Sequence, residues 1–226
     1  SGGNHKITLA IGEAYGYRGA DEAKNEAGKD NGNTGAVYDH KYQGLFAEIS
    51  KATIKDLTLD GSICIDANAD DIYCGAAAAQ FSGNTTAENV KSNVKIIFDT
   101  NGSIDKKSSA SGKRAGAGML FGIDSADSDN AAVELKNCSS KFDMTLCGFS
   151  NTSYNEISAG TISRIQNAST TVKVDGMEIS GNLTNSINKY TDTSDRTYYF
   201  YGYGGLIGVV EHQTTKHEIK LNNVKV

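Results

Sequence analysis

The sequence predicts an all-β domain in which short strands recur along the chain and stack on one another. Val, Ile, Leu, Phe and Tyr fall in short runs rather than in long helical periods, and the 25 glycines together with abundant Asn, Ser, Thr and Asp favour turns between these runs. A degenerate repeat also recurs at intervals of 31 to 45 residues, within the range found in stacked repeat folds. We expect one elongated domain, because all-β domains of 226 residues are commonly single.

The first part of the repeat is a short apolar segment that opens with a glycine. The segments GLFAEIS, GAAAAQF, GMLFGID, GTISRIQ and GLIGVVE begin at Gly44, Gly75, Gly118, Gly160 and Gly205. Glycine suits a sharp corner with positive φ or a close approach of neighbouring backbones. Each segment is therefore predicted to be a strand that starts at a corner.

The second part of the repeat follows a polar spacer and alternates apolar and polar residues. Its members are IKDLTL at 54–59, VKSNVKI at 90–96, LKNCSSKF at 135–142, VDGMEI at 174–179 and LNNVKV at 221–226. The Asp, Asn or Gly at positions 56, 137, 176 and 223 suits a bend between short strands. Each segment has one apolar stripe that is too small to be buried alone, so stacked equivalents are expected to form parallel sheets around a common core.

This repeat resembles a known family. The glycine-led opening and the L-K-N-V-x-V-like strand resemble the GLUG-type repeat of large bacterial cell-surface proteins over residues 44–226, and the arrangement resembles a right-handed parallel β-helix. The resemblance implies a solenoid of about five coils, with units that start near 44, 75, 118, 160 and 205. It also implies an extracellular location, at the bacterial cell surface or secreted, within a longer chain that has flanking domains. It supplies no catalytic residues, because the family's repeat defines a scaffold.

Residues 1–43 do not follow the repeat. KITLAI at 6–11 alternates like a strand, and ADEAKNEA at 20–27 is typical of one or two helical turns. We expect this region to be an irregular first coil and cap, which covers the otherwise exposed edge of the sheet.

Composition and charge argue against two classes of partner. The net charge is −5 and the 22 basic residues are scattered, so no positive patch for nucleic acid is expected. No stretch approaches the roughly 20 consecutive apolar residues of a membrane-spanning helix.

The four cysteines lie at 64, 74, 138 and 147 and lack the CxxC spacing that is usual for structural zinc. We expect free thiols, because the aligned positions of the repeat are apolar, although the sequence leaves disulfide pairing open.

Two acidic clusters could bind calcium. Asp66, Asn68 and Asp70 have the 1, 3, 5 spacing of a calcium loop, but the sixth position is not Gly and the twelfth is Ala77 rather than Glu. A second cluster contains the aspartates at 124, 127 and 129. We interpret both clusters as solvated loops, with weak calcium binding as the alternative, and expect no metal site and no cofactor.

The aromatic run TYYFYGYGGLIG at 197–208 is the candidate binding surface. In a strand, Tyr199, Tyr201 and Tyr203 share one face, from which exposed rings could stack on a glycan or bind a host surface protein. The alternative is that the rings are structural, which the similar stretch EAYGYRGA at 13–20 favours. Sequence alone does not decide between the two.

We expect a non-catalytic, extracellular adhesin-type repeat domain that binds or displays towards host or polysaccharide ligands. The first alternative is a structural spacer of a long surface protein. The second is a polysaccharide lyase or hydrolase on a β-helix, although fold alone does not imply activity. The sequence contains no GxSxG, P-loop or HExxH motif, so the enzyme alternative has no motif to support it.

Overall fold

The computed structural model describes residues 5–11, 42–66, 72–99, 114–125, 131–149, 156–167, 169–188, 200–211 and 217–226. Within these ranges all regular elements are β-strands and none is a helix. The pairings between these strands are parallel. The predicted all-β class and the predicted parallel sheets are therefore confirmed.

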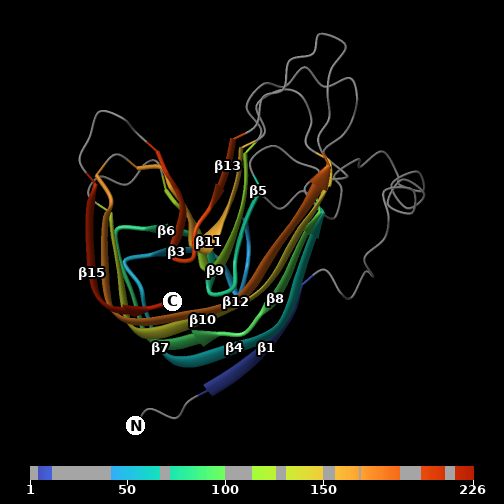
Figure 1. Cartoon of the computed structure of the whole chain (residues 1–226). Helices are drawn as coiled ribbons and strands as arrows, with labels where there is room; N and C mark the ends of the chain where they lie inside the picture. Colours follow the sequence, from blue (N-terminus) through green and yellow to red (C-terminus); the bar gives the residue numbers. More distant parts are fainter. Residues whose placement is uncertain are drawn as a thin grey trace, which may run out of the picture.

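The strands form two sheets. Sheet A contains β1 (His5–Ile11), β4 (Thr53–Asp66), β7 (Asn84–Ser92), β8 (Lys95–Asp99), β10 (Ala132–Phe149), β12 (Thr171–Asn188) and β15 (Glu218–Lys225). Sheet B contains β2 (Tyr42–Gln43), β3 (Phe46–Ser50), β5 (Ile72–Gly75), β6 (Ala78–Ser82), β9 (Arg114–Asp124), β11 (Glu156–Ile165), β13 (Phe200–Tyr203) and β14 (Ile207–Val210). Figure 1 shows sheet A as a broad curved wall along the bottom of the view, with the strands of sheet B above it and between its arms.

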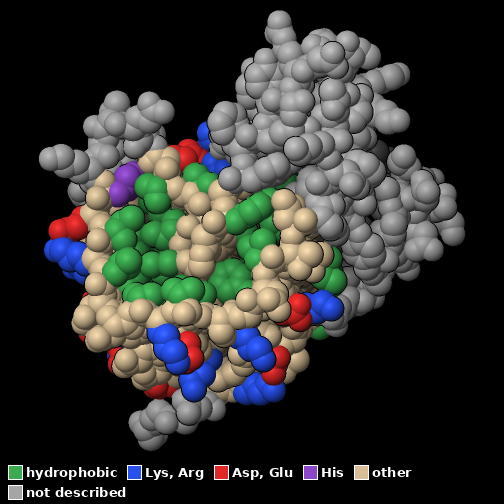
Figure 2. All heavy atoms as spheres, viewed as in Figure 1, with side chains coloured by type: hydrophobic (Ala, Val, Ile, Leu, Met, Phe, Trp, Pro, Cys, Tyr) green, Lys and Arg blue, Asp and Glu red, His purple; other side chains and the backbone are tan. Residues whose placement is uncertain are grey.

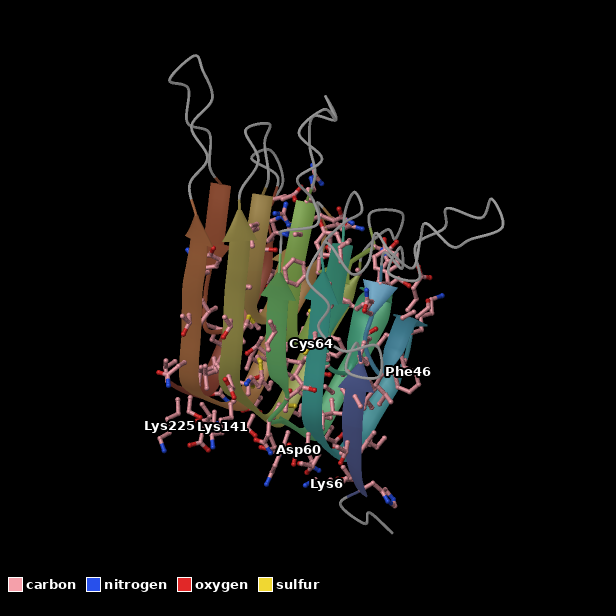
Figure 3. The ribbon with its side chains drawn as sticks, turned by 90° about the vertical axis from the view of Figure 1, so that its right-hand side faces the viewer. Lys6, Phe46, Asp60, Cys64, Lys141 and Lys225 are labelled. Carbon is pink, nitrogen blue, oxygen red and sulfur yellow. The ribbon has the colours of Figure 1, made fainter. Side chains whose placement is uncertain are left out.

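From β2 onwards the chain alternates between sheet B and sheet A and thereby forms five successive units. Unit 1 contains β2, β3 and β4; unit 2 contains β5 to β8; unit 3 contains β9 and β10; unit 4 contains β11 and β12; unit 5 contains β13, β14 and β15. Each unit pairs with the next in both sheets, so the strands lie side by side in unit order (Figure 3). The glycine-led segments lie in sheet B and the second segments lie in sheet A, as the repeat predicts.

Equivalent residues of successive units lie in register and form rows across sheet A. One row is apolar and faces the core, and it consists of Ile54, Ala87, Leu135, Val174 and Leu221. Two positions further along lies a row of left-handed residues, Asp56, Asn89, Asn137, Gly176 and Asn223, with φ between 49° and 78°. Asn, Asp and Gly tolerate this conformation best, so the row explains why these types recur at the bend.

The core lies between the two sheets. A single cluster of buried apolar side chains joins them, with Leu59 and Ile63 contributed by sheet A and Phe121 and Ile162 by sheet B. Neither sheet buries its apolar rows alone, which is the expected behaviour of stacked units.

The strands of sheet B bend sharply at the repeated glycines. In β11 the Oγ atoms of Ser158 and Ser163 lie 2.7 Å apart on either side of Gly160. A Cβ added at Gly118 would overlap the carbonyl group of Phe121, so the glycine permits a close approach of backbones. Positive φ is not the reason, because none of these repeated glycines is among the described glycines with positive φ, which are Gly61, Gly83, Gly176 and Gly181.

The structure corrects the sequence alignment of unit 2. Ala87, not Val90, lies in the row of Ile54, and Val90 aligns with Leu57. A small Ala fills the first inward position here, and the sequence alignment therefore placed the start of this segment three residues late, at Val90. The register of β9 against β11 also shifts between Gly160 and Ile162.

The strand predicted at 6–11 is confirmed, because β1 lies beside β4 at the unit 1 end of sheet A. It pairs with residues 57–63 of β4 and covers that part of the sheet edge. The helical turns predicted at 20–27 lie outside the described residues. The division of the chain at residues 43 and 44 stays a prediction.

Candidate functional site

The predicted aromatic binding row lies only partly within the described residues. Tyr199 lies outside them, whereas Tyr201 and Tyr203 belong to β13, where they pair with Ile157 and Ala159. Ile157 and Ala159 are buried, and the half-buried Tyr203 packs against the same core. This environment favours a structural role for Tyr203. Ligand binding by Tyr199, Tyr201 and Tyr203 stays a prediction.

The proposed calcium loop at 66–77 is also only partly described. Asp66 ends β4 and pairs with Asp99 of β8, and Asn68 and Asp70 lie outside the described residues. In the part of the chain that the structure describes, no three His, Cys, Asp or Glu side chains are grouped to hold a metal. Calcium binding at 66–70 therefore stays untested.

Among the described residues, a cluster of polar side chains lies where the strands of sheet B end and the chain turns towards sheet A. We call it the polar corner, and its members are Asp124, Arg164, Thr170, Glu211 and His217. They come from the end of β9, the end of β11, the turn before β12, the residue after β14 and the residue before β15. The polar corner therefore draws on three consecutive units.

Asp124 is the most enclosed acid of the polar corner. Its Oδ1 accepts a hydrogen bond from Gln166 N at 2.5 Å, and its Oδ2 accepts from Asn167 N at 3.1 Å and Thr170 Oγ1 at 2.5 Å. Burial raises the pKa of Asp124, and these three donors act against that rise.

The expectation of a solvated loop is wrong for Asp124, because its side chain is completely buried. Its carboxylate accepts hydrogen bonds from the turn of the next unit and does not face water. The other aspartates of that cluster, Asp127 and Asp129, lie outside the described residues.

Glu211 links three units through its carboxylate. It forms an ion pair with the almost completely buried Arg164 of unit 4, and its Oε2 lies 3.5 Å from Arg114 Nη1 of unit 3. A carboxylate held between two guanidinium groups is well suited to fix the register of neighbouring units.

His217 closes the polar corner on the side of sheet A. Its Nε2 donates a hydrogen bond to the carbonyl oxygen of Glu211 at 2.8 Å, and its Nδ1 lies 3.4 Å from the carbonyl oxygen of Thr170. The ring therefore connects the end of β14 with the start of β15 in unit 5 and with the turn of unit 4.

The polar corner is suited to bracing the stack rather than to acid-base chemistry. Asp124 has no exposed surface through which a substrate could reach it, and Glu211 is engaged by two arginines. Sequence reasoning missed Arg164 and Glu211, because their contact spans 47 residues and Arg164 lies within a segment read as apolar.

The outer face of sheet A carries a row of alternating charge. Lys55, Glu88, Lys136 and Asp175 are aligned in successive units, and Asn222 follows them in unit 5. Lys55 Nζ lies 2.8 Å from Glu88 Oε2. Opposite charges on neighbouring strands favour this register over a slipped one.

Further charged side chains lie along the rim at the bottom of Figure 3, where Lys6, Asp60, Lys141 and Lys225 are labelled. Lys6 Nζ contacts Asp60 Oδ2 at 2.6 Å. The Lys6 ammonium lowers the pKa of Asp60 through a hydrogen bond, and the backbone N–H of Gly61 adds to the effect.

The side chains of three of the four cysteines are described, namely Cys64, Cys74 and Cys138, and none of the three forms a disulfide. The expectation of free thiols is confirmed for these three. Burial raises the pKa of Cys74 to about 12, and burial also raises the pKa of Cys138. Both are packing residues in the core rather than nucleophiles, because only the thiolate is reactive.

Comparison with known proteins finds no matching family model, no matching curated protein and no matching solved structure. A search of the described residues for helices that could cross a membrane finds none.

Proposed function

We propose that the five units form a right-handed parallel β-helix that serves as a non-catalytic, extracellular repeat domain of the GLUG type. The supporting observation is the register of the units, in which rows of equivalent residues continue from unit 1 to unit 5 in sheet A. Such a stack is a stiff scaffold, because each unit is held by its neighbours on both sides.

The position of the connections supports a display function. The ends of β4, β8, β10 and β12 are aligned, since Asp66 pairs with Asp99, Asp99 with Cys147 and Phe149 with Asn188. The connections that follow these ends are residues 67–71, 100–113, 150–155 and 189–199. They differ in length while the strands keep their register, which is typical of ligand-binding connections on a constant scaffold. We therefore propose that this side of the domain contacts a polysaccharide or a host surface protein.

Binding should be tested with glycan arrays, immobilised matrix proteins and host cells. We expect the intact domain to bind at least one of these, and we expect separate replacement of 100–113 or 189–199 by a short Gly-Ser linker to reduce that binding. The second replacement also removes Tyr199. Lys136→Ser on the outer face of sheet A is the matched control and should bind as the intact domain does.

Two outcomes would overturn the proposal. Absence of binding in every assay would leave the domain as a spacer of a longer surface protein. Release of new reducing ends or unsaturated products from a polysaccharide would instead identify the β-helix enzyme, and the products would be followed in the same samples.

A further inference from the structure

Some lysines on the outer face of sheet A have exposed side chains that form no hydrogen bond or ion pair. Figure 2 shows the charged side chains along the lower outer edge, which sheet A forms. Within the described strands of this sheet, the lysines that contact a carboxylate within 3.4 Å are Lys6, Lys55, Lys136, Lys220 and Lys225. The lysines of these strands without such a contact are Lys91, Lys95, Lys141 and Lys173.

Three of these lysines lie close together on units 2 and 3, and we call them the lysine triad. Lys91 of β7 is aligned with Ser139 and Lys95 of β8 with Asp143, so Lys141 of β10 falls between them on the neighbouring strand. One strand spacing and two residues separate Lys141 from each of the other two, which places their Cα atoms about 8 Å apart. One extended ligand could therefore contact all three.

The lysine triad lies in the middle of the stack. β7 and β8 pair with β4 on one edge and with β10 on the other, and β10 pairs with β12 along Lys141. The positions of the three lysines are therefore set by described strands on both sides. Figure 3 places Lys141 on the lower rim of sheet A, whereas the arrowheads of the strands lie at the upper end. The triad is thus a surface separate from the aligned strand ends.

The nearest acidic side chains leave the triad with a surplus of positive charge. Asp143 is aligned with Lys95 but forms no ion pair with it. Asp60 and Glu178, on the strands to either side, are already engaged by other lysines. Three lysines therefore stand against one free carboxylate, in a chain whose net charge is −5. Positive side chains that lie close together raise the local potential and attract anions.

The residue types of the triad indicate which anions it suits. A lysine ammonium is a hydrated point charge on a flexible chain, which matches carboxylate or sulfate groups spread along a ligand. Planar, two-point recognition of a phosphate favours arginine, and the two described arginines belong to sheet B. Sites for single-stranded nucleic acid add aromatic side chains to a basic groove, and the rows of Lys91 and Lys95 contain none.

We propose that the lysine triad binds an acidic polysaccharide through the carboxylate or sulfate groups of the sugar chain. Such groups recur along the chain, so one chain can contact two or three of the lysines at once. Each exposed ion pair contributes little, but contacts made by the same chain reinforce one another. This surface is additional to the connections proposed above as a contact region, and neither proposal depends on the other.

Binding to immobilised polysaccharides tests the proposal, with polygalacturonate as the carboxylate probe, heparin as the sulfate probe and dextran as the neutral one. We expect the intact domain to bind at least one acidic probe and not dextran, and to bind more weakly at about 0.15 M salt than at low salt. Replacement of all three triad lysines by Gln should weaken binding about tenfold, the combined effect of three exposed ion pairs.

A second triple variant controls for net charge. Replacement of Lys55, Lys136 and Lys220 by Gln removes the same charge from lysines that already contact carboxylates, so it should weaken binding much less. Urea unfolding verifies that both variants are folded. Binding of one acidic probe alone would support the proposal and identify the acidic group.

Three results would overturn the proposal. These are no binding to either acidic probe, equal losses in the two triple variants, and tighter binding of the triad to duplex DNA than to both acidic polysaccharides. Replacement of 100–113 or 189–199 leaves the triad intact, so failure of the triad and failure of the connections can be told apart in the same assay.

Discussion

Asn89 donates a hydrogen bond from its side-chain Nδ2 to Asp56 Oδ1 of the preceding unit at 2.9 Å, and both residues adopt the left-handed backbone conformation. Their φ angles are 55° and 53°. The same conformation recurs at the equivalent residue of each later unit, namely Asn137, Gly176 and Asn223. In unit 1 the residue after this bend is Leu57, whose side chain is buried. The bend therefore determines which of the following side chains face the core.

Substitution of Asn137 tests the need for this conformation. Asn137→Val should lower the free energy of unfolding by about 1–2 kcal/mol, because a β-branched residue disfavours the left-handed region. Asn137→Gly should change it little, since glycine adopts this conformation without strain. Urea unfolding measures both variants, and equal losses in the two would contradict the explanation.

The buried ion pair of the polar corner gives a second prediction. Glu211→Gln should lower the free energy of unfolding by about 3 kcal/mol, because it leaves the buried Arg164 guanidinium without its carboxylate. Arg114→Met removes the more exposed partner of the same carboxylate and should cost less than about 1 kcal/mol. If the two variants lose similar amounts of unfolding free energy, burial of the arginine does not determine how much the ion pair contributes.

Two buried hydroxyl groups give a third prediction. The Oγ atoms of Ser92 and Ser140 lie in one row and have no hydrogen-bond partner. Ser140→Ala removes such a group and should raise the free energy of unfolding by about 1 kcal/mol. Ser163→Ala is the control, because Ser163 Oγ donates to the carbonyl oxygen of Ser158 at 3.1 Å, and this variant should be less stable by about 1 kcal/mol. A loss of stability in Ser140→Ala would contradict the prediction.

Asp124 gives a prediction about pH. Its pKa is raised by burial, so the native state holds the proton more tightly than the unfolded chain does. The contribution of this group to stability is therefore greatest below its unfolded pKa and falls as pH rises through its folded pKa. The free energy of unfolding of the wild type minus that of Asp124→Asn should therefore decrease as pH rises from about 3 to about 7. This trend does not depend on which of the two proteins is the more stable at low pH.

Asp60 is the matched control for this measurement. Its pKa is lowered, with Lys6 as the main cause, so its contribution to stability is present above the unfolded pKa and is lost as pH falls through the folded pKa. The stability of the wild type relative to Asp60→Asn should therefore change with pH in the opposite direction. Unfolding curves at a series of pH values measure both differences, and slopes of the same sign would contradict the assignment.

The repeat could be predicted from sequence because its signal is local. A glycine, a short apolar run and an Asn, Asp or Gly between apolar residues recur in every unit, and these types are required by backbone geometry and by the core rows. Unit 2 was misaligned because Ala87 is a small residue at an inward position, and the register shift in β11 has no counterpart in the residue types.

The polar corner could not be predicted in the same way. Asp124, Arg164 and Glu211 belong to different units, and their contacts depend on the register of the sheet rather than on spacing along the chain. The aromatic row illustrates the same limit, because alternation places Tyr201 and Tyr203 on one face but does not tell which face meets the core. The contacts of these residues are determined by how neighbouring units align in the sheets.

The distance between Lys55 and Asn222 tests the parallel stacking of all five units most directly. These residues are separated by four strand spacings through Glu88, Lys136 and Asp175, which amounts to about 19 Å at about 4.8 Å per spacing. Spin labels attached through unnatural amino acids would leave the cysteines untouched, and pulsed electron paramagnetic resonance would measure the distance in dilute protein. We predict one narrow distribution centred at about 20 Å, after allowance for the label arms. A broad distribution, or one centred at a clearly longer distance, would contradict the stacked arrangement.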